Sequence, residues 1–149
     1  MSNLDERNET AMILNDAVRQ ALTSGHNAHL VTLNPDGSPQ VSLVWVGLDG
    51  NEIVCAHLST WKKVRNIQHD ARVTLSLETG GKSGGMENYL VISGRARVTE
   101  GGAPELLHQL AQVYRGPGTQ YPPANSPAGY ITHIEAERIY GIGPWKTQP

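Results

Sequence analysis

The sequence predicts a mainly β, α+β fold: a six-stranded antiparallel split β-barrel with peripheral helices. Short runs rich in Val, Leu and Ile recur along the chain, as is typical of strands. Turn signals such as Asn34-Pro35-Asp36-Gly37 and Asp49-Gly50 separate them, and such short connections favour antiparallel neighbours. Few segments have the apolar spacing of helices, so the helices are expected to lie around the sheet.

The first half of the chain begins with a helix and continues with strands. Apolar residues recur at helical spacing over Ala11–Leu22, and Ser24-Gly25 follows them as a terminator. Three consecutive antiparallel strands are then predicted, over Ala28–Leu33, Gln40–Leu48 and Glu52–Leu58.

The second half alternates in the same way. A short helix is predicted over Trp61–His69, and a second, amphipathic helix starts at Pro104 and Glu105 and is ended by Gly116-Pro117. The remaining strands are predicted over Arg72–Glu78, Tyr89–Val98 and Gly129–Tyr140. Proline recurs within residues 118–128, which predicts a loop there.

Length and charge place limits on the function. The 149 residues fit one domain, residues 1–149. Twelve Lys and Arg against fourteen Asp and Glu give a net charge of −2, so no basic excess indicates nucleic acid or an anionic membrane. The polar amino terminus and the lack of a run of about twenty apolar residues predict a cytoplasmic protein without a membrane segment. Cys55 is the only cysteine, which suits a reducing compartment.

The glycine-rich stretch Gly80–Gly85 contains two fragments of catalytic motifs. Gly81-Lys82-Ser83 matches the end of a nucleotide loop, and Gly81–Gly85 spells Gly-x-Ser-x-Gly. Both motifs require a helix next, whereas a strand is predicted, so the stretch is interpreted as a hairpin. Zinc is a further alternative because the chain has six histidines, but only His26 and His29 lie close together, without a third ligand nearby.

The strongest functional signal is the segment Ser59–Ile67, where hydroxyl and cationic residues gather at a predicted strand-to-helix junction. Free N–H groups at a helix start, together with the positive end of its dipole, favour an anion. The cations near this junction indicate one small polyanion, or else a solvated helix face: Lys62, Lys63, Arg65 and Arg72.

Three segments carry a family resemblance: Asp36–Ser42, Thr60–Ile67 with the following Asp70–Val73, and Tyr89–Ala96. Together they resemble the pyridoxamine-phosphate-oxidase-like split-barrel superfamily of flavin and deazaflavin proteins. The resemblance implies a homodimer with cofactor sites at the subunit interface. By position, Lys63 resembles the family's phosphate-binding lysine. The other residues that the resemblance places beside the cofactor are Thr60, Lys62, Ser42, Val44, Ala56 and His57, with Tyr89 and Trp145 from the partner chain.

Within the superfamily, the chain is most similar to the branch that uses the deazaflavin coenzyme F420. The acidic tail of this coenzyme could lie along Lys62 or Arg65. A pyridoxamine-phosphate oxidase would carry an Arg-x-His motif near its end, where Pro144-Trp145-Lys146 stands here. The resemblance therefore implies a reductase that passes hydride from the reduced deazaflavin to an activated double bond of a small organic substrate. The candidate proton donors are Tyr89, Tyr130 and His57.

Two alternatives stay open at this point. One is an FMN-binding protein of the pyridoxamine 5'-phosphate oxidase type, which would use the same phosphate site at Lys63. The other is a non-enzymatic module that binds the cofactor or a tetrapyrrole-like ligand.

Overall fold

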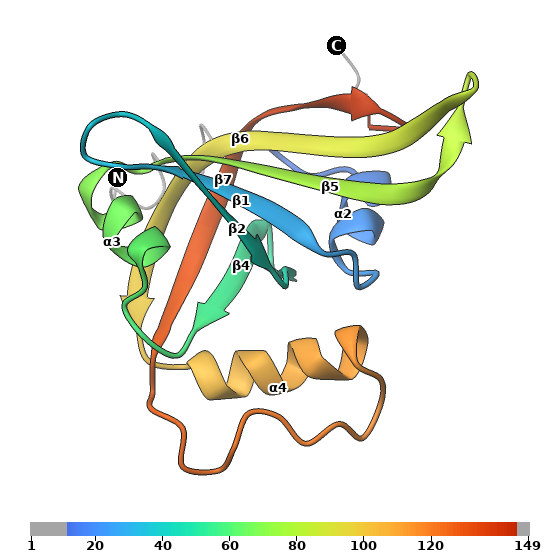
Figure 1. Cartoon of the computed structure of the whole chain (residues 1–149). Coiled ribbons are helices and arrows are strands. Elements are labelled where there is room, and N and C mark those ends of the chain that lie inside the picture. The colour runs from blue at the N-terminus through green and yellow to red at the C-terminus, as the bar shows by residue number, and fades with distance from the viewer. Residues whose placement is uncertain (1–11, 146–149) are drawn as a thin grey trace, which may run out of the picture.

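The computed structural model describes residues 12–145 and contains one seven-stranded antiparallel sheet (Figure 1). Its strand order is β2-β1-β5-β6-β7-β4-β3. The strands are β1 (Ala28–Leu33), β2 (Pro39–Val44), β3 (Gly47–Asp49), β4 (Glu52–His57), β5 (Arg72–Ser83), β6 (Met86–Glu100) and β7 (Tyr130–Ile142). The helices are α2 (Asp16–Leu22), α3 (Lys62–His69) and α4 (Ala103–Tyr114).

The prediction of six strands is wrong because the segment Gln40–Leu48 forms two strands instead of one. β2 pairs with β1 and β3 pairs with β4, so the two halves have different neighbours. Between them, the amide of Val46 donates to the hydroxyl of Tyr114 at 2.9 Å instead of to a strand. This contact explains the break, since it removes the amide from the sheet.

The break also decides the shape of the sheet. β2 and β3 are its two edges, so the sheet is open and not a closed barrel. Only Trp45 and Val46 connect these edges, so the three Cα–Cα steps from Val44 to Gly47 span about 11 Å at most. The sheet therefore curls until its edges approach each other at this corner, where it remains split.

The first helix starts later than the predicted Ala11, which itself lies outside the described residues. The side chain of Asn51 holds the preceding segment extended: it accepts a hydrogen bond from the Leu14 amide at 2.9 Å and donates to the Met12 carbonyl at 2.8 Å. Asn15 then caps α2, because its side-chain oxygen accepts from the Val18 amide. A long-range contact and a local cap thus override the helical spacing of the sequence.

The predicted hairpin at the glycine-rich stretch is confirmed, and its strands are longer than expected. β5 and β6 continue to a turn at Gly84 and Gly85, with Ser83 paired to Met86. Lys82 therefore lies on a strand and no helix follows it, so the phosphate-loop interpretation does not hold.

The three helices of residues 12–145 lie around the curled sheet, as predicted (Figure 1). α3 packs on β1 and β6 through the buried Val64 and Ile67, while α4 packs on β4. The core fills the inside of the curl with side chains that include Leu30, Leu75 and Ile134. Within residues 12–145, no helix is both long and apolar enough to cross a membrane.

Gly94 marks a register shift between β6 and β7, and we expect Gly94→Ala to destabilise the fold. A Cβ atom here would lie 1.9 Å from the carbonyl oxygen of Glu135, so the two strands would have to separate. The free energy of unfolding should fall by about 3 kcal/mol, measured by urea denaturation. Gly37→Ala is the control. Its Cβ would meet nothing within 4 Å, and its positive φ of 86° should make it cost only about 1 kcal/mol. Equal losses for both variants would contradict this account.

Candidate functional site

A cavity of about 200 Å³ lies where β2, β4, α3 and α4 meet. Its walls are mainly apolar and include Leu43, Val44, Ala56, Leu58 and Leu107. The charged residues that line it are Lys63 and Arg115, and no Asp or Glu lines it. An apolar cavity with two cations suits a largely apolar ligand that carries negative charge.

The start of α3 forms one side of this cavity and leaves its positive end uncompensated. Trp61 is the N-cap residue, but no side chain caps the helix, and the first turn contains no acidic residue. The carbonyl of Trp61 accepts from the amides of Val64 and Arg65. The hydroxyls of Ser59 and Thr60, which suggested a phosphate site, do not cap this helix. The capping position is therefore free for an anion.

Lys63 projects from this first turn and is a buried cation. Only 7% of the residue is exposed, and no carboxylate in the described part of the chain pairs with it. Its Nζ lies 4.7 Å from the centre of the Trp61 ring, and burial lowers the pKa of the ammonium group. A buried charge without a counter-ion is unfavourable, so an anion in the cavity would stabilise this lysine.

His57 lies at the end of β4 and is almost completely buried. Its Nε2 is 2.9 Å from the Thr132 hydroxyl oxygen. Burial, with a smaller contribution from the nearby charge of Lys63, lowers the pKa of His57 from 6.5 to about 4. The imidazole is therefore neutral at neutral pH, and Lys63 is the cation at this end of the cavity.

The structure brings four of the predicted site residues together and leaves the others outside the cavity. The four that line it are Lys63, Val44, Ala56 and His57. Thr60 and Lys62 are exposed just before and at the start of α3, and Ser42 lies on β2 opposite Leu30 without lining the cavity. Tyr89 and Trp145 contact each other elsewhere, where the indole Nε1 donates to the Tyr89 carbonyl at 2.8 Å. Their contribution from a partner chain stays a prediction.

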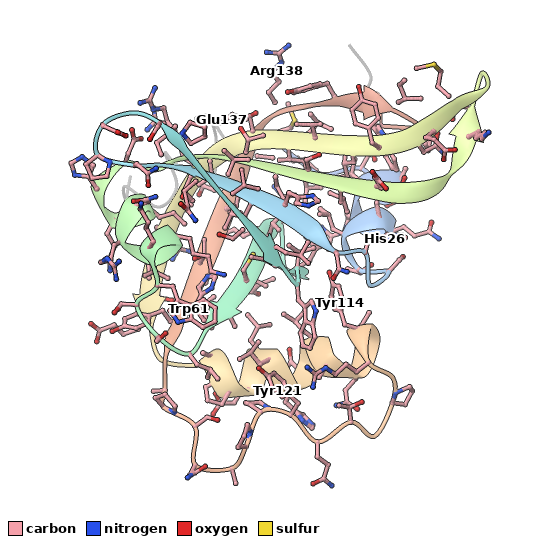
Figure 2. The ribbon with its side chains drawn as sticks, viewed as in Figure 1. His26, Trp61, Tyr114, Tyr121, Glu137 and Arg138 are labelled. Carbon is pink, nitrogen blue, oxygen red and sulfur yellow. The ribbon has the colours of Figure 1, made fainter. Side chains whose placement is uncertain are left out.

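Sequence reasoning missed three aromatic and cationic residues of the cavity: Trp45, Arg115 and Tyr121. They come from the break between β2 and β3, the end of α4 and the loop after α4. Figure 2 labels Tyr121 beside α4 and Trp61 just before α3. Tyr121 belongs to a Tyr-Pro-Pro motif that the sequence does display. Trp45 and Arg115 carry no local signal, because the packing of α4 on the sheet brings them together.

Comparison with known proteins gives the family. A family model described as pyridoxamine 5'-phosphate oxidase matches residues 14–142, so the chain belongs to this family. No curated protein matches the sequence.

Three solved structures share the fold. An F420 reductase superposes with a TM-score of 0.70 at 24% identity, over 85% of this chain and 98% of its own. A conserved hypothetical protein from Mycobacterium tuberculosis superposes with a TM-score of 0.68 at 22% identity, over 89% of this chain and 86% of its own. A candidate pyridoxamine 5'-phosphate oxidase from Listeria innocua superposes with a TM-score of 0.61 at 18% identity, over 85% of this chain and 95% of its own. At such identities these similarities establish the fold alone.

The neutral state of His57 makes stability depend on pH. Because its pKa is lower in the folded protein than in the unfolded chain, the unfolded chain binds a proton first as the pH falls. Stability should therefore decrease from pH 6.5 to about pH 4, by at most about 3 kcal/mol. Urea denaturation across this range should show the loss in the wild type and a much flatter profile in His57→Gln. His29→Gln, at an exposed position on β1, is the matched control and should keep the wild-type profile. Parallel profiles for wild type and His57→Gln would contradict the assignment.

Proposed function

We propose that the chain binds the phosphate of coenzyme F420 beside Lys63 and acts as a reductase. Its substrate is a small organic molecule with an activated double bond. One observation carries this proposal: a buried lysine, which has no carboxylate partner among residues 12–145, faces the cavity at the uncapped start of α3. A phosphate there would gain a charge-assisted hydrogen bond from Lys63 and the favourable end of the helix dipole.

The residues present fit such a cofactor. Lys63 and the first turn of α3 would hold the phosphate, and the ring system would lie along Val44 and Ala56. The cavity of about 200 Å³ is smaller than the range of about 300–1,000 Å³ usual for ligand sites, so one chain would enclose only part of the cofactor.

A second copy of the chain would complete the site. Three large side chains beside the cavity are more than half exposed: Val41, Leu43 and Trp61. Exposed apolar groups of this size next to a ligand site favour an interface. We therefore propose a homodimer with the cofactor sites between the subunits, in which Tyr89 and Trp145 would come from the partner chain.

The chain's own contribution to the reaction is binding, orientation and exclusion of water. When bound, the reduced coenzyme supplies the hydride, and a proton completes the reduction of the double bond. The low pKa of His57 and its contact with Thr132 make it a poor acid at neutral pH. Tyr89, Tyr130 or solvent would then supply the proton.

The choice of F420 over FMN rests on two observations. The fold is similar to that of an F420 reductase, and the exposed Lys62 lies next to the proposed phosphate site, where it could meet the acidic tail. Arg65 fits this role less well than expected, because its guanidinium donates to the Thr60 carbonyl. An FMN-dependent protein using the same Lys63 is the second candidate, supported by the family match.

Equilibrium titration of the purified, cofactor-stripped protein with coenzyme F420 and with FMN, followed by fluorescence quenching, tests the proposal. We expect tighter binding of F420, followed by turnover with acceptors that contain an activated double bond. Tighter binding of FMN would assign the protein to the flavin-dependent type. Binding of F420 without turnover across such acceptors would favour a non-enzymatic module. Binding of neither would contradict the proposed site.

Lys63→Met should separate binding from stability. It keeps the length of the side chain and removes the charge, so affinity for the phosphate-bearing cofactor should fall by about tenfold or more. Thermal stability without ligand should be unchanged or higher, because an unpaired buried charge is removed. Lys62→Met, at an exposed neighbouring position, should change the affinity for FMN by less than about threefold. Equal effects of the two variants on FMN binding would contradict the role of Lys63.

A further inference from the structure

A cluster of aromatic rings holds a guanidinium group at the cavity. Trp45 and Tyr114 are stacked, with ring centres 5.1 Å apart and planes 12° from parallel, and Tyr121 meets Trp45 edge-on at 5.8 Å. The Cζ of Arg115 lies 5.2 Å from the centre of the Trp45 ring and 4.5 Å from that of Tyr121. Arg115, Trp45 and Tyr121 all line the same cavity as Lys63.

Hydrogen bonds hold this cluster in place. The Tyr114 hydroxyl donates to the His26 carbonyl at 2.7 Å and accepts from the Val46 amide, which ties the end of α4 to the sheet break (Figure 2). The side chain of Gln112 accepts from the Gly118 amide at 2.7 Å and donates to the Thr119 carbonyl at 2.8 Å. The loop that carries Tyr121 is thus fastened to α4, which keeps the rings of Trp45 and Tyr121 packed on Arg115.

The charge of Arg115 is available to a ligand. No carboxylate in residues 12–145 forms an ion pair with it, and none lines the cavity. The two ring contacts hold the guanidinium group in place, and a guanidinium presents five N–H donors in a planar fork. Such donors match the two oxygens of a carboxylate.

Arg115 and Lys63 lie toward opposite ends of α4. Gly129 places the backbone of His57 against Ala103 at the start of this helix, and Lys63 is close enough to His57 to lower its pKa. Arg115 is the C-cap residue, about 12 Å along α4 from Leu107 at a rise of about 1.5 Å per residue. Figure 1 likewise shows α3 on the side where α4 begins. One cation can therefore hold a cofactor phosphate while the other meets a second anionic group.

We infer that Arg115, supported by Trp45 and Tyr121, binds the carboxylate of the substrate, and that the substrates are small, planar unsaturated carboxylic acids. This inference rests on the proposed function. The apolar and aromatic walls favour a planar hydrocarbon part. Pairing of the conjugated carboxylate with the Arg115 guanidinium would offset its negative charge and so make the double bond a better hydride acceptor. Arg115 thereby sets both the specificity of the site and the orientation of the substrate.

The test compares two probes of the same shape, cinnamate and the neutral cinnamamide, by isothermal titration calorimetry. Wild-type protein should bind cinnamate about tenfold or more tightly than cinnamamide, both alone and saturated with whichever cofactor binds. In Arg115→Gln the two affinities should lie within about threefold of each other. Arg115→Lys keeps the charge without the planar donors, so its preference for cinnamate should lie between those of the wild type and Arg115→Gln. Thermal melting checks that the variants fold.

Arg138→Gln is the matched control, because Arg138 also lies over a ring, 4.8 Å from the centre of Tyr140, but does not line the cavity. It should keep the wild-type preference for cinnamate. A wild type without this preference, or an Arg115→Gln variant that retains it, would overturn the inference. The inference would also fail if Arg115→Gln bound F420 more weakly while its affinities for FMN and cinnamate stayed at the wild-type values. Arg115 would then bind the acidic tail of the cofactor. If the wild type bound neither cofactor yet preferred cinnamate, the proposed cofactor would fail while the carboxylate site would stand.

Discussion

The hydroxyl of Tyr114 joins the parts of the fold that meet at the cavity. It accepts from the amide of Val46, at the break between β2 and β3, and donates to the carbonyl of His26, before β1. The break makes β2 and β3 the two edges of an open sheet, and the cavity lies beside it. The same contact stacks Tyr114 on Trp45, whose other neighbours are Arg115 and Tyr121. One side chain thus links the topology of the sheet to the chemistry of the site.

The second constraint is electrostatic. Lys63 is buried and has no ion-pair partner in the described part of the chain, which carries an unfavourable free energy that an anionic ligand would relieve. Its charge also disfavours protonation of the neighbouring His57. The charged residues of the cavity are two cations, Lys63 in the first turn of α3 and Arg115 directly after α4. A ligand with negative groups at both ends of an apolar body, or a cofactor and a substrate with one negative group each, matches this arrangement.

Local sequence patterns predicted most of the helices in residues 12–145 and the strand-rich character. They also singled out Lys63, which lines the cavity, while its role as a phosphate ligand stays a prediction. They did so because hydrophobic spacing, turn residues and helix-start chemistry act over a few positions. The predictions were wrong where a side chain distant in the sequence determines the local structure. Val46 leaves the sheet because of Tyr114, and α2 starts late because Asn51 holds the chain before it. Arg115 escaped detection for the same reason, since a single arginine after a helix gives no sign that a tryptophan will lie beneath it.

The decisive measurement is the pKa of the Lys63 ammonium group, determined by NMR on lysine-labelled protein with and without FMN or coenzyme F420. We expect the pKa of Lys63 in the free protein to lie below that of an ordinary lysine, because of burial, and to rise when the cofactor phosphate binds next to it. A cofactor that binds while the pKa of Lys63 stays constant would show that the phosphate lies elsewhere and would contradict the site.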